Sequence, residues 1–310
     1  MSIAVGLGLS DYPFSSSDFF WDWVGICEAG GVDSLWQTDR IVSRKPILET
    51  VTVMAAIAGA TRRIKFGMNV VSLGLRDPLL LAKQCATIDV LSQGRLLPAF
   101  GVGNIRAPEW KATSLPTKGR GQRTNEGLHI LGRLWTEDEV TFQGRFYTYN
   151  SASISPKPMQ KRLPMWIGGS SPAAIQRTAR FGTGWQAGFE TPAEVADAIQ
   201  AIKEALVREG RNIAEDHYGA SFGYRFGSWS DLAVERSAQS VRERLGRKPN
   251  EVFAVGDARH IVDRLGQYVA AGASKFILRP IADGDADILA QSKMLINEIL
   301  PEIKRLNVAH

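Results

Sequence analysis

The stretch PMWIGGSSPAAIQRTARF, residues 164–181, joins a short apolar run to an amphipathic helical pattern through a turn of glycine and serine. The same order recurs along the chain and gives eight units of apolar run and helical pattern. Such alternation is typical of buried parallel strands joined by right-handed helical crossovers. The predicted strands are Ile3–Leu9, Ser34–Thr38, Ile64–Val71, Leu96–Val102, Pro164–Gly168, Gly184–Gly188, Tyr218–Phe226 and Lys275–Arg279.

Eight units favour an α/β fold in which the parallel sheet closes into a (β/α)8 TIM barrel, and an open doubly wound sheet is the alternative. Two segments fall outside the alternation. Residues 140–149 carry Gln143-Gly144 between apolar arms and predict an added β-hairpin, and residues 228–246 predict an extra helical segment before the last βα unit. Because no linker of domain size interrupts the pattern, we predict that residues 1–310 form one domain.

The predicted helices follow the strands and carry recognisable end signals. Pro172 and Pro192 fall at first-turn positions, and Gly272 follows a helix end. The helices are expected at Ser17–Ala29, Leu48–Ala60, Leu79–Leu91, Asn125–Trp135, Pro172–Phe181, Pro192–Glu209, Ala258–Ala271 and Asp285–Leu306.

The composition is that of an ordinary globular protein with a mildly basic balance. The chain has 310 residues, 44% apolar residues and a formal net charge of +5. No apolar run approaches the ~20 residues of a membrane span, and residues 1–9 lack a signal-peptide pattern, so we expect a cytoplasmic protein without membrane insertion. The basic residues alternate with acidic ones, which argues against a nucleic-acid partner and favours a basic rim for a small anion.

Cysteine and histidine offer no metal site. Cys27 and Cys85 fall in helical patterns far from any Cys-x-x-Cys motif, so we expect buried packing thiols. No two histidines have the short spacing of metal ligands on a helix. Structural or solvated roles are therefore expected for His129, His217, His260 and His310. Among the tryptophans, core positions are expected for Trp36 and Trp185, and pocket-lining positions for Trp110 and Trp229.

The opening stretch also contains a candidate anion site. Active sites of (β/α)8 barrels form in the loops after the strands. Gly168 and Gly169 let the backbone approach a ligand, and Ser170 and Ser171 supply hydroxyl groups just before a helix that begins at Pro172. The unpaired N–H groups of a helix N-terminus favour an anion such as phosphate. The alternative is that Ser171 only caps the helix.

An ordered series of motifs between about residues 30 and 190 connects the chain to a known family. The series is SLWQTDR (34–40), IKFGMNVV (64–71), RDP (76–78), IDVLSQGR (88–95), FGVG (100–103), RTNE (123–126), LWT (134–136), PKP (156–158) and IGGSS (167–171). In order and spacing it resembles the bacterial luciferase-like superfamily of flavin- and deazaflavin-dependent oxidoreductases.

The resemblance implies cofactor-binding roles for the phosphate loop and a nearby arginine. Ser170, together with Gly168, Gly169 and Ser171, matches the family's phosphate loop, and Arg123 matches a basic residue that also contacts the cofactor phosphate. A guanidinium and a helix N-terminus together stabilise a dianion better than either does alone. The alternative for Arg123 is a solvated arginine at a helix start.

Further cofactor contacts are implied at the ends of the third and fourth strands. The resemblance implies a bulge with a non-prolyl cis peptide at Asn69-Val70, which supports one face of the ring system. Gly101 and Gly103 would keep side chains away from the flat ring, and Asn104 would hydrogen-bond its polar edge. The alternative is that these glycines serve only as turn residues.

Arg40 is a departure from the pattern, because many relatives carry a histidine there. Arginine stays protonated and cannot act as a general base. The catalytic candidates are therefore Arg40 and Asp39, with Arg40 either holding an anionic substrate, stabilising a developing anion, or pairing with Asp39 as structure.

The leading interpretation is a monooxygenase that uses reduced FMN, delivered by a separate flavin reductase, and oxygen to oxygenate a small organic substrate. The chain has no Gly-x-Gly-x-x-Gly motif after a strand, so a dedicated dinucleotide domain is absent. The first alternative is a dehydrogenase or reductase that transfers hydride with the deazaflavin coenzyme F420. A third interpretation is a non-catalytic flavin-binding protein. The resemblance also implies a homodimer that pairs through helices of the first half, where Ala55, Ala56 and Ala58 permit close approach.

Overall fold

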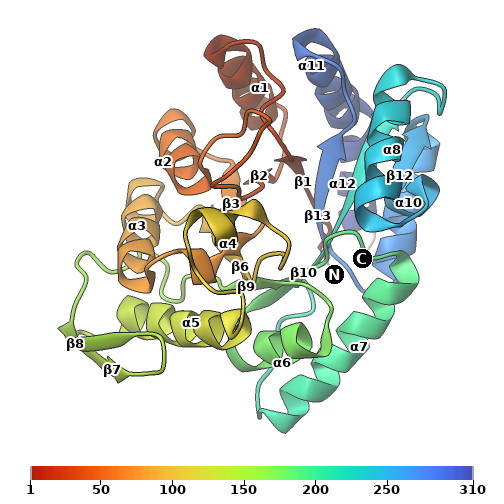
Figure 1. Ribbon diagram of the computed structural model, residues 1–310. Coiled ribbons are helices and arrows are strands. Elements are labelled where there is room, and N and C mark those ends of the chain that lie inside the picture. The colour runs from red at the N-terminus through yellow and green to blue at the C-terminus, as the bar shows by residue number, and fades with distance from the viewer. Residues whose placement is uncertain (1, 309–310) are drawn as a thin grey trace.

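The computed structural model describes residues 2–308 and contains a curled parallel sheet with helices on its outside (Figure 1). Hydrogen-bonded neighbours run in the order β4-β6-β9-β10-β11-β13-β1-β2-β3-β5, and β12 pairs with β11 beside this path. The bounds are β1 Ala4–Leu9, β2 Ser34–Gln37, β3 Lys65–Met68, β4 Val71–Ser72, β5 Leu96–Leu97, β6 Ala99–Gly101, β9 Trp166–Gly168, β10 Gly184–Gln186, β11 Tyr218–Phe226, β12 Phe253–Gly256 and β13 Lys275–Pro280. The predicted α/β class with a parallel sheet is confirmed.

The two ends of this path belong to neighbouring stretches of chain. β3 pairs with β5 and β4 pairs with β6, both in parallel. β3 continues into β4 across Asn69-Val70, and β5 continues into β6 across Pro98. The predicted strands 64–71 and 96–102 are thus each divided in two, and the sheet curls back toward its own beginning around a central axis.

The helices surround the sheet, so that its outer face is covered (Figure 1). Their bounds are α1 Ser17–Ala29, α2 Thr50–Ala60, α3 Pro78–Leu91, α4 Pro108–Ala112, α5 Arg120–Thr136, α6 Pro172–Phe181, α7 Pro192–Arg208, α8 Leu232–Leu245, α9 Pro249–Val252, α10 Ala258–Ala270, α11 Asp285–Met294 and α12 Leu300–Val308, with short helical turns η1 Leu73–Leu75 and η2 Leu295–Ile299. Pro172 and Pro192 occupy first-turn positions as predicted. None of the helices within residues 2–308 combines the length and apolar character that a membrane crossing requires.

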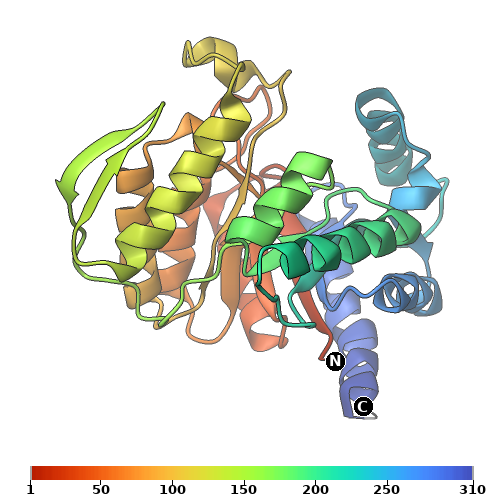
Figure 2. The ribbon, with the colours of Figure 1, turned by 90° about the horizontal axis from the view of Figure 1, so that it is seen from below.

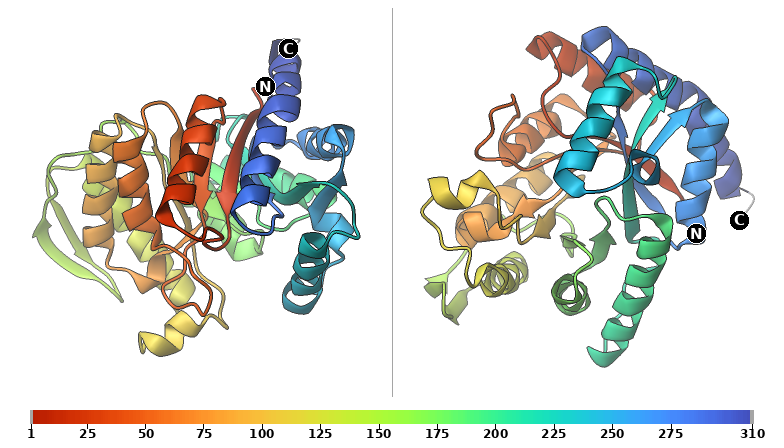
Figure 3. Two further views of the ribbon diagram at one scale, coloured as in Figure 1. Left: turned by 90° about the horizontal axis from the view of Figure 1, so that it is seen from above. Right: turned by 45° about the vertical axis from the view of Figure 1, so that its right-hand side comes forward.

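The chain ends of the described region lie side by side (Figure 3). The backbone N–H of Ile3, just before β1, donates to Oδ1 of Asn307 in α12 at 2.8 Å, and Nδ2 of Asn307 donates back to the Ile3 carbonyl. This reciprocal pair fixes the last helix against the start of the sheet.

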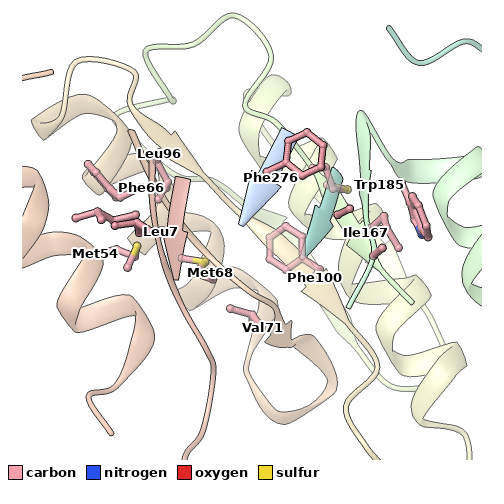
Figure 4. Packing of buried hydrophobic residues seen from close by; sticks show 14 of the residues in the cluster. Leu7, Met54, Phe66, Met68, Val71, Leu96, Phe100, Ile167, Trp185 and Phe276 are labelled. Carbon is pink, nitrogen blue, oxygen red and sulfur yellow. The ribbon is translucent and has the colours of Figure 1, made fainter. Parts of the chain in front are cut away.

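Apolar side chains alternate between two layers, as expected of strands with both faces buried. One layer fills the space between sheet and helices, and Figure 4 shows part of it around Leu7, Phe66, Phe100, Ile167, Trp185 and Phe276. A separate inner cluster consists of Trp36, Ala99, Trp166 and Ile277. A Cβ added to Gly67 would lie 2.6 Å from the Trp36 ring, and one added to Gly184 would lie 2.7 Å from the Trp166 ring. Glycine at these positions therefore makes room for two tryptophans inside the sheet.

Two segments lie outside the strand–helix alternation. β7 Val140–Gln143 and β8 Thr148–Ala152 form an antiparallel pair on the outer side of α5 (Figure 2). The backbone N–H groups of Arg145 and Phe146 between them donate to the Glu126 carboxylate of α5, at 3.0 and 2.9 Å. The second segment, α8, packs with α9 and β12 over a small apolar cluster of its own.

Cys27 and Cys85 are fully buried in α1 and α3, which confirms the predicted packing thiols. Burial raises the pKa of both thiols, and that of Cys85 reaches about 12. At neutral pH both are therefore protonated and unreactive.

Candidate functional site

We call the opening at the C-terminal ends of the parallel strands the mouth; α4 lies in front of it in Figure 1. Three of the predicted cofactor residues meet here, because they end neighbouring strands. The Val70 side chain lies between Gly101 and Gly168. A Cβ added to Gly101 would lie 2.7 Å from Cγ2 of Val70, and a Cβ added to Gly168 would lie 3.0 Å from Cγ1 of Val70. The Asn69-Val70 peptide bond is cis, which confirms that prediction.

Asn69 carries an unsatisfied polar atom. Its backbone N–H donates to the Gln37 carbonyl at 2.8 Å, but its side-chain Nδ2 is buried without a hydrogen-bond partner among the described residues. Buried polar groups are nearly always paired, so this unpaired amide nitrogen just beyond the end of β3 indicates a missing acceptor.

The predicted phosphate loop follows β9 directly. Gly169 has φ of 101°, which a side chain rarely permits, and the indole N–H of Trp185 donates to its carbonyl at 2.8 Å. Ser171 is the N-cap of α6, and its hydroxyl accepts from the N–H of Ala174 at 3.3 Å. The capping role considered for Ser171 is therefore confirmed, and Ser170 is left as the exposed hydroxyl of the loop.

Ser170 is engaged by a residue that the sequence did not suggest. Its hydroxyl donates to Oε1 of Glu190 at 2.6 Å, and Oε2 of Glu190 accepts from the N–H of Gly188 at 2.6 Å. The hydroxyl of Tyr268 holds the Glu190 carbonyl at 2.8 Å. A carboxylate thus lies where an anion on Ser170 would lie, and such an anion must displace it.

Arg123 lies in the first turns of α5, not ahead of the helix. Its guanidinium stacks over the Phe146 ring at 4.9 Å, and its Nη1 is buried without a partner. Its Cδ comes within 3.7 Å of a Cβ built on Gly74 in η1. No hydrogen bond or ion pair joins the Arg123 guanidinium to any residue within 2–308, and its buried Nη1 is therefore not solvated as the alternative interpretation expected. The predicted pairing of Arg123 with Ser170 on one phosphate stays a prediction, since no contact between them is observed.

The loop after β6 is built around Gly103. It has φ of 71°, and a Cβ there would lie 3.0 Å from the Ser72 hydroxyl and 3.3 Å from the Trp110 ring. The Asn104 carbonyl accepts from the Trp110 indole at 2.9 Å, while its Oδ1 accepts from the Arg106 N–H at 2.8 Å. Trp110 is therefore a buried support of this loop in α4 and not a pocket wall, and only the Asn104 amide nitrogen is left for a ligand.

Both carboxylate oxygens of Asp39 accept hydrogen bonds, and most of these belong to a buried ion pair. Its carboxylate accepts from Nη1 and Nη2 of Arg76 at 2.8 and 2.7 Å and from the Ser72 N–H at 3.0 Å. Arg76 also contacts Glu49, the N-cap of α2, at 2.9 Å. Burial lowers the pKa of Arg76, but hydrogen bonds and charge from Asp39 and Glu49 outweigh it and raise the pKa overall. Asp39 thus joins the loop after β2 to Ser72 in β4 and to Arg76 after η1, and its predicted catalytic role stays a prediction.

Arg40 does not pair with Asp39, which corrects one of the expectations for it. Its Nη1 lies 3.4 Å from Oε1 of Glu109 in α4, because Asp39 already has Arg76. The Glu109 side chain is 4% exposed and that of Arg40 is 31% exposed. The pair is long and leaves part of the Arg40 guanidinium open to the mouth.

Arg279 is a further cation at the mouth that the sequence interpretation passed over. It stands at the end of β13, stacked over the Phe189 ring at 5.2 Å. Its Nε and Nη1 are buried without a partner. Charged residues inside an apolar strand near its C-terminal end are the sequence signal that marks this position.

Histidine is absent from these contacts. His217 stacks on Trp166 with ring centroids 5.6 Å apart, and His260 contacts Asp257 at the start of α10. His129 is exposed on α5, and His310 lies outside the described residues. Within residues 2–308 no three His, Cys, Asp or Glu side chains gather as a metal site would require.

Two cavities lie away from the mouth, on the outer side of α5 and α6. The larger has a volume of about 290 Å³ and is lined by Asn125, Ala173, Gln176, Arg177, Arg180, Phe181 and Glu209. Arg177 closes its inner side by donating to Oδ1 of Asn125 at 2.7 Å. These cavities contain none of the predicted site residues.

The residues at the mouth fit a cofactor with an anionic tail and a flat polar ring. Arg123 offers an unpaired buried N–H, and Asn69 offers an unpaired amide. The N-terminus of α6 offers only the backbone N–H of Ala173, because Pro172 has none and Ser171 accepts from those of Ala174 and Ile175. The Glu190 carboxylate opposes an anion at Ser170, because it already accepts the Ser170 hydroxyl hydrogen.

Comparison with known proteins identifies the family of the chain. The family model described as luciferase-like monooxygenase matches residues 15–275. An uncharacterised protein of Mycobacterium tuberculosis is 33% identical over 168 residues, which are 54% of this chain and 57% of that protein. The chain therefore spans little more than half the length of this relative.

Other relatives have assigned activities. An F420-dependent glucose-6-phosphate dehydrogenase of Microbacterium testaceum is 25% identical over 95% of this chain and 97% of its own. Pyrimidine monooxygenase RutA of Cronobacter turicensis is 29% identical over 63% of this chain and 51% of its own.

Solved structures show the same fold at low identity. Monooxygenase RslO1 from Streptomyces bottropensis superposes with a TM-score of 0.81 at 19% identity, covering 97% of this chain and 99% of that one. An F420-dependent secondary alcohol dehydrogenase gives the same TM-score at 17% identity, covering 98% and 99%.

Proposed function

The chain belongs to the luciferase-like monooxygenase family, and from that premise we propose that it is a monooxygenase that uses reduced FMN and oxygen on a small organic substrate. Membership makes it an enzyme of the oxidoreductase class. The observation that carries the proposal is the buried guanidinium nitrogen Nη1 of Arg123, which has no hydrogen-bond partner within residues 2–308.

In this proposal the residues after β9 and in α5 hold the cofactor phosphate. Ser170 donates its hydroxyl hydrogen to a phosphate oxygen after Glu190 is displaced, while Gly168, Gly169 and the capped start of α6 present backbone N–H groups. Arg123 adds a charged donor. Reduced FMN, when bound, supplies the electrons that activate oxygen.

The ends of β3, β4 and β6 would hold the ring. Val70 offers an apolar surface behind it, and Asn69 Nδ2 donates to one of its carbonyl oxygens. Gly103 keeps the loop after β6 free of side chains, and Asn104 supplies an amide. Arg40, partly free of Glu109, stabilises negative charge that develops on the substrate, because it cannot take a proton.

A separate flavin reductase would deliver the reduced cofactor to this cytoplasmic enzyme. We take residues 1–310 as one (β/α)8 domain, to which the β7–β8 hairpin and α8 are additions. We also propose a homodimer through the first helices. Ala55 and Ala56 are exposed on α2 and suit such a contact, whereas Ala58 is buried against the sheet and serves the core.

A second candidate is hydride transfer with the deazaflavin F420. It is favoured by the similarity to the Microbacterium testaceum dehydrogenase over 95% of this chain. The same phosphate loop would serve this cofactor. A non-catalytic flavin-binding protein is the third candidate, favoured only by arginine at position 40.

Binding of oxidised FMN and of F420 to the purified chain tests these alternatives. We expect micromolar or tighter binding of one cofactor, and a dissociation constant raised about tenfold by Ser170→Ala and by Arg123→Met, because each loses a charge-assisted hydrogen bond. Ser153→Ala, at an exposed serine of the hairpin segment without a hydrogen bond, is the matched control.

Rapid mixing of the reduced complex then separates the functions. Fast reaction with oxygen supports the monooxygenase, and hydride transfer without oxygen consumption supports the deazaflavin enzyme. A complex that does neither would be a binding protein. Failure of both cofactors to bind would overturn the proposal altogether.

A further inference from the structure

Arg279 is placed to meet a molecule inside the mouth. On β13 the side chains of Phe276 and Leu278 belong to the layer against the helices, whereas Ile277 belongs to the inner cluster. By strand alternation Arg279 lies on the same side as Ile277, one step nearer the mouth. Its Cγ is 3.6 Å from a Cβ built on Gly8 of β1, so glycine leaves space for the arginine stem.

The guanidinium of Arg279 has no compensating group in the chain. No hydrogen bond or ion pair joins it to any residue within 2–308, and Nε and Nη1 are buried. Burial alone lowers the pKa of Arg279 to about 10. Arg279 is half-buried, and leaving two of its buried donor nitrogens without an acceptor is costly, so an acceptor from a ligand would stabilise it.

A neighbouring arginine shows what structural compensation looks like here. Arg225 lies on β11, which pairs with β13 through Gly223 and Arg279. Its Nε contacts Asp231 at 2.6 Å, and its Nη1 contacts Asp287 and the Ile281 carbonyl at 2.7 and 2.8 Å. Two carboxylates, those of Asp231 and Asp287, therefore contact Arg225, and no carboxylate within residues 2–308 contacts Arg279.

Phe189 sets the orientation of the free guanidinium. The guanidinium carbon lies over its ring, 5.2 Å from the ring centroid, and this cation–π contact stabilises the charge. A stacked guanidinium presents its edge, with parallel N–H bonds that match the two oxygens of a carboxylate or phosphate. A neutral ligand would gain only uncharged hydrogen bonds from this arrangement, and a cationic ligand would be repelled.

The anion bound there is distinct from the proposed cofactor phosphate. The phosphate loop follows β9, and β10 and β11 separate that strand from β13. Arg279 therefore lies on another strand end than the residues that would hold the ring and its phosphate, which end or follow β3, β4, β6 and β9. Phe189 and Glu190 are consecutive residues, so one loop contacts both places.

We propose that Arg279 binds an oxyanion group, a carboxylate or a phosphate, on the organic substrate, and so selects anionic substrates. This inference rests on the proposed function for the identity of the ligand as substrate. The proposal of an anion site rests only on the contacts of Arg279. The test therefore distinguishes failure of the anion site from failure of the proposed function.

The experiment titrates the full chain, without cofactor, with sodium acetate and with inorganic phosphate at constant ionic strength set by chloride. Calorimetry measures the binding. Because the phosphate loop also attracts phosphate, the titrations are made in Ser170→Ala as well. We expect Arg279→Met to lower the remaining phosphate affinity, and the acetate affinity, at least tenfold. The tighter probe identifies the oxyanion class.

Arg236→Met is the matched control, because it removes the same charge from an exposed arginine of α8. It should leave both affinities unchanged. Arg279→Lys keeps the charge without the planar fork, and we expect a severalfold loss; this variant decides the matter if Arg279→Met does not fold. Equal binding of both probes by wild type and the Arg279 variants would overturn the proposal.

A separate outcome concerns the proposed function. Should neither FMN nor F420 bind while Arg279-dependent anion binding persists, the anion site stands and the flavin assignment fails. With both present, substrates that carry an oxyanion should lose kcat/KM at least tenfold more than their neutral analogues do in Arg279→Met, and severalfold more in Arg279→Lys.

Discussion

Arg225 and Arg279 occupy neighbouring strands and the same face of the sheet, yet they have opposite surroundings. Arg225 has two carboxylates and a carbonyl, and Arg279 has an aromatic ring and no anion. The burial of a charge is tolerated in both cases for different reasons. A compensated arginine fastens loops together, whereas an uncompensated one at a mouth is available to a ligand.

The same contrast appears across the mouth. Arg76 joins Asp39 and Glu49 and so connects the loops after β2 and β3 with the start of α2. Arg123 has only Phe146 beside it. Arg76 and Arg225 are paired with carboxylates and so serve the structure, whereas Arg123 and Arg279 have no such partner within residues 2–308 and are available to a ligand. This difference leads to measurable predictions.

The largest effect is expected for Asp39→Asn. Its carboxylate is 2% exposed and accepts two hydrogen bonds from Arg76, so its loss leaves a buried guanidinium only partly paired. We expect the free energy of unfolding to fall by about 3 kcal/mol in urea denaturation. Asp33→Asn, which breaks the exposed pair with Lys65, should cost less than about 1 kcal/mol. Equal losses would mean that burial does not distinguish the two pairs.

The paired variants Arg225→Met and Arg279→Met address the comparison directly. We expect Arg225→Met to lower the free energy of unfolding by about 2 kcal/mol, because Asp231 and Asp287 lose their partner but still reach solvent. Arg279→Met should leave stability unchanged or higher, since an unpaired buried charge is removed. Thermal and urea unfolding of both variants measure this. A loss in Arg279→Met as large as that in Arg225→Met would refute the distinction.

The smallest effect concerns pH. Burial acts to raise the pKa of Glu49, but hydrogen bonds from the Thr52 N–H and Arg76 outweigh it and lower the pKa below its ordinary value of about 4.5. A carboxylate with a lowered pKa stabilises the fold above its unfolded pKa, and this contribution disappears as the pH falls through the folded value. Glu49→Gln should therefore make the unfolding free energy fall less steeply below pH 4.5. An unchanged slope would contradict it.

Much of the fold was predictable because its elements are defined by local pattern. Ser17–Ala29, Pro172–Phe181 and Tyr218–Phe226 have the bounds that the sequence predicts. The five-residue helix α4 was missed, because Pro108–Ala112 is too short for a periodic signal. The strand 64–71 was predicted as one piece, and its interruption at Asn69-Val70 was expected only through the family resemblance.

Those residues of the candidate site that directly follow a strand were predictable from the sequence. The side chains that contact them from distant parts of the chain were not. Gly169 and Ser170 are apparent in the sequence because glycine and serine precede a helix. Glu190 binds Ser170 across 20 residues, and Glu109 reaches Arg40 across 69. Such contacts depend on how loops fold over the mouth, so no local spacing indicates them. The lack of a hydrogen-bond partner for Arg279 within residues 2–308 likewise depends on which side chains fold around it, so the sequence does not show it.

The inner cluster has an optical consequence. Trp36 and Trp166 lie inside the sheet, beneath the mouth, where glycine makes room for their rings. Flavins absorb light in the range where tryptophan emits, so a flavin in the mouth would take up excitation energy from these two indoles. The protein thus contains its own fluorescent donors, and the decrease in their emission on titration would report cofactor occupancy without any added label.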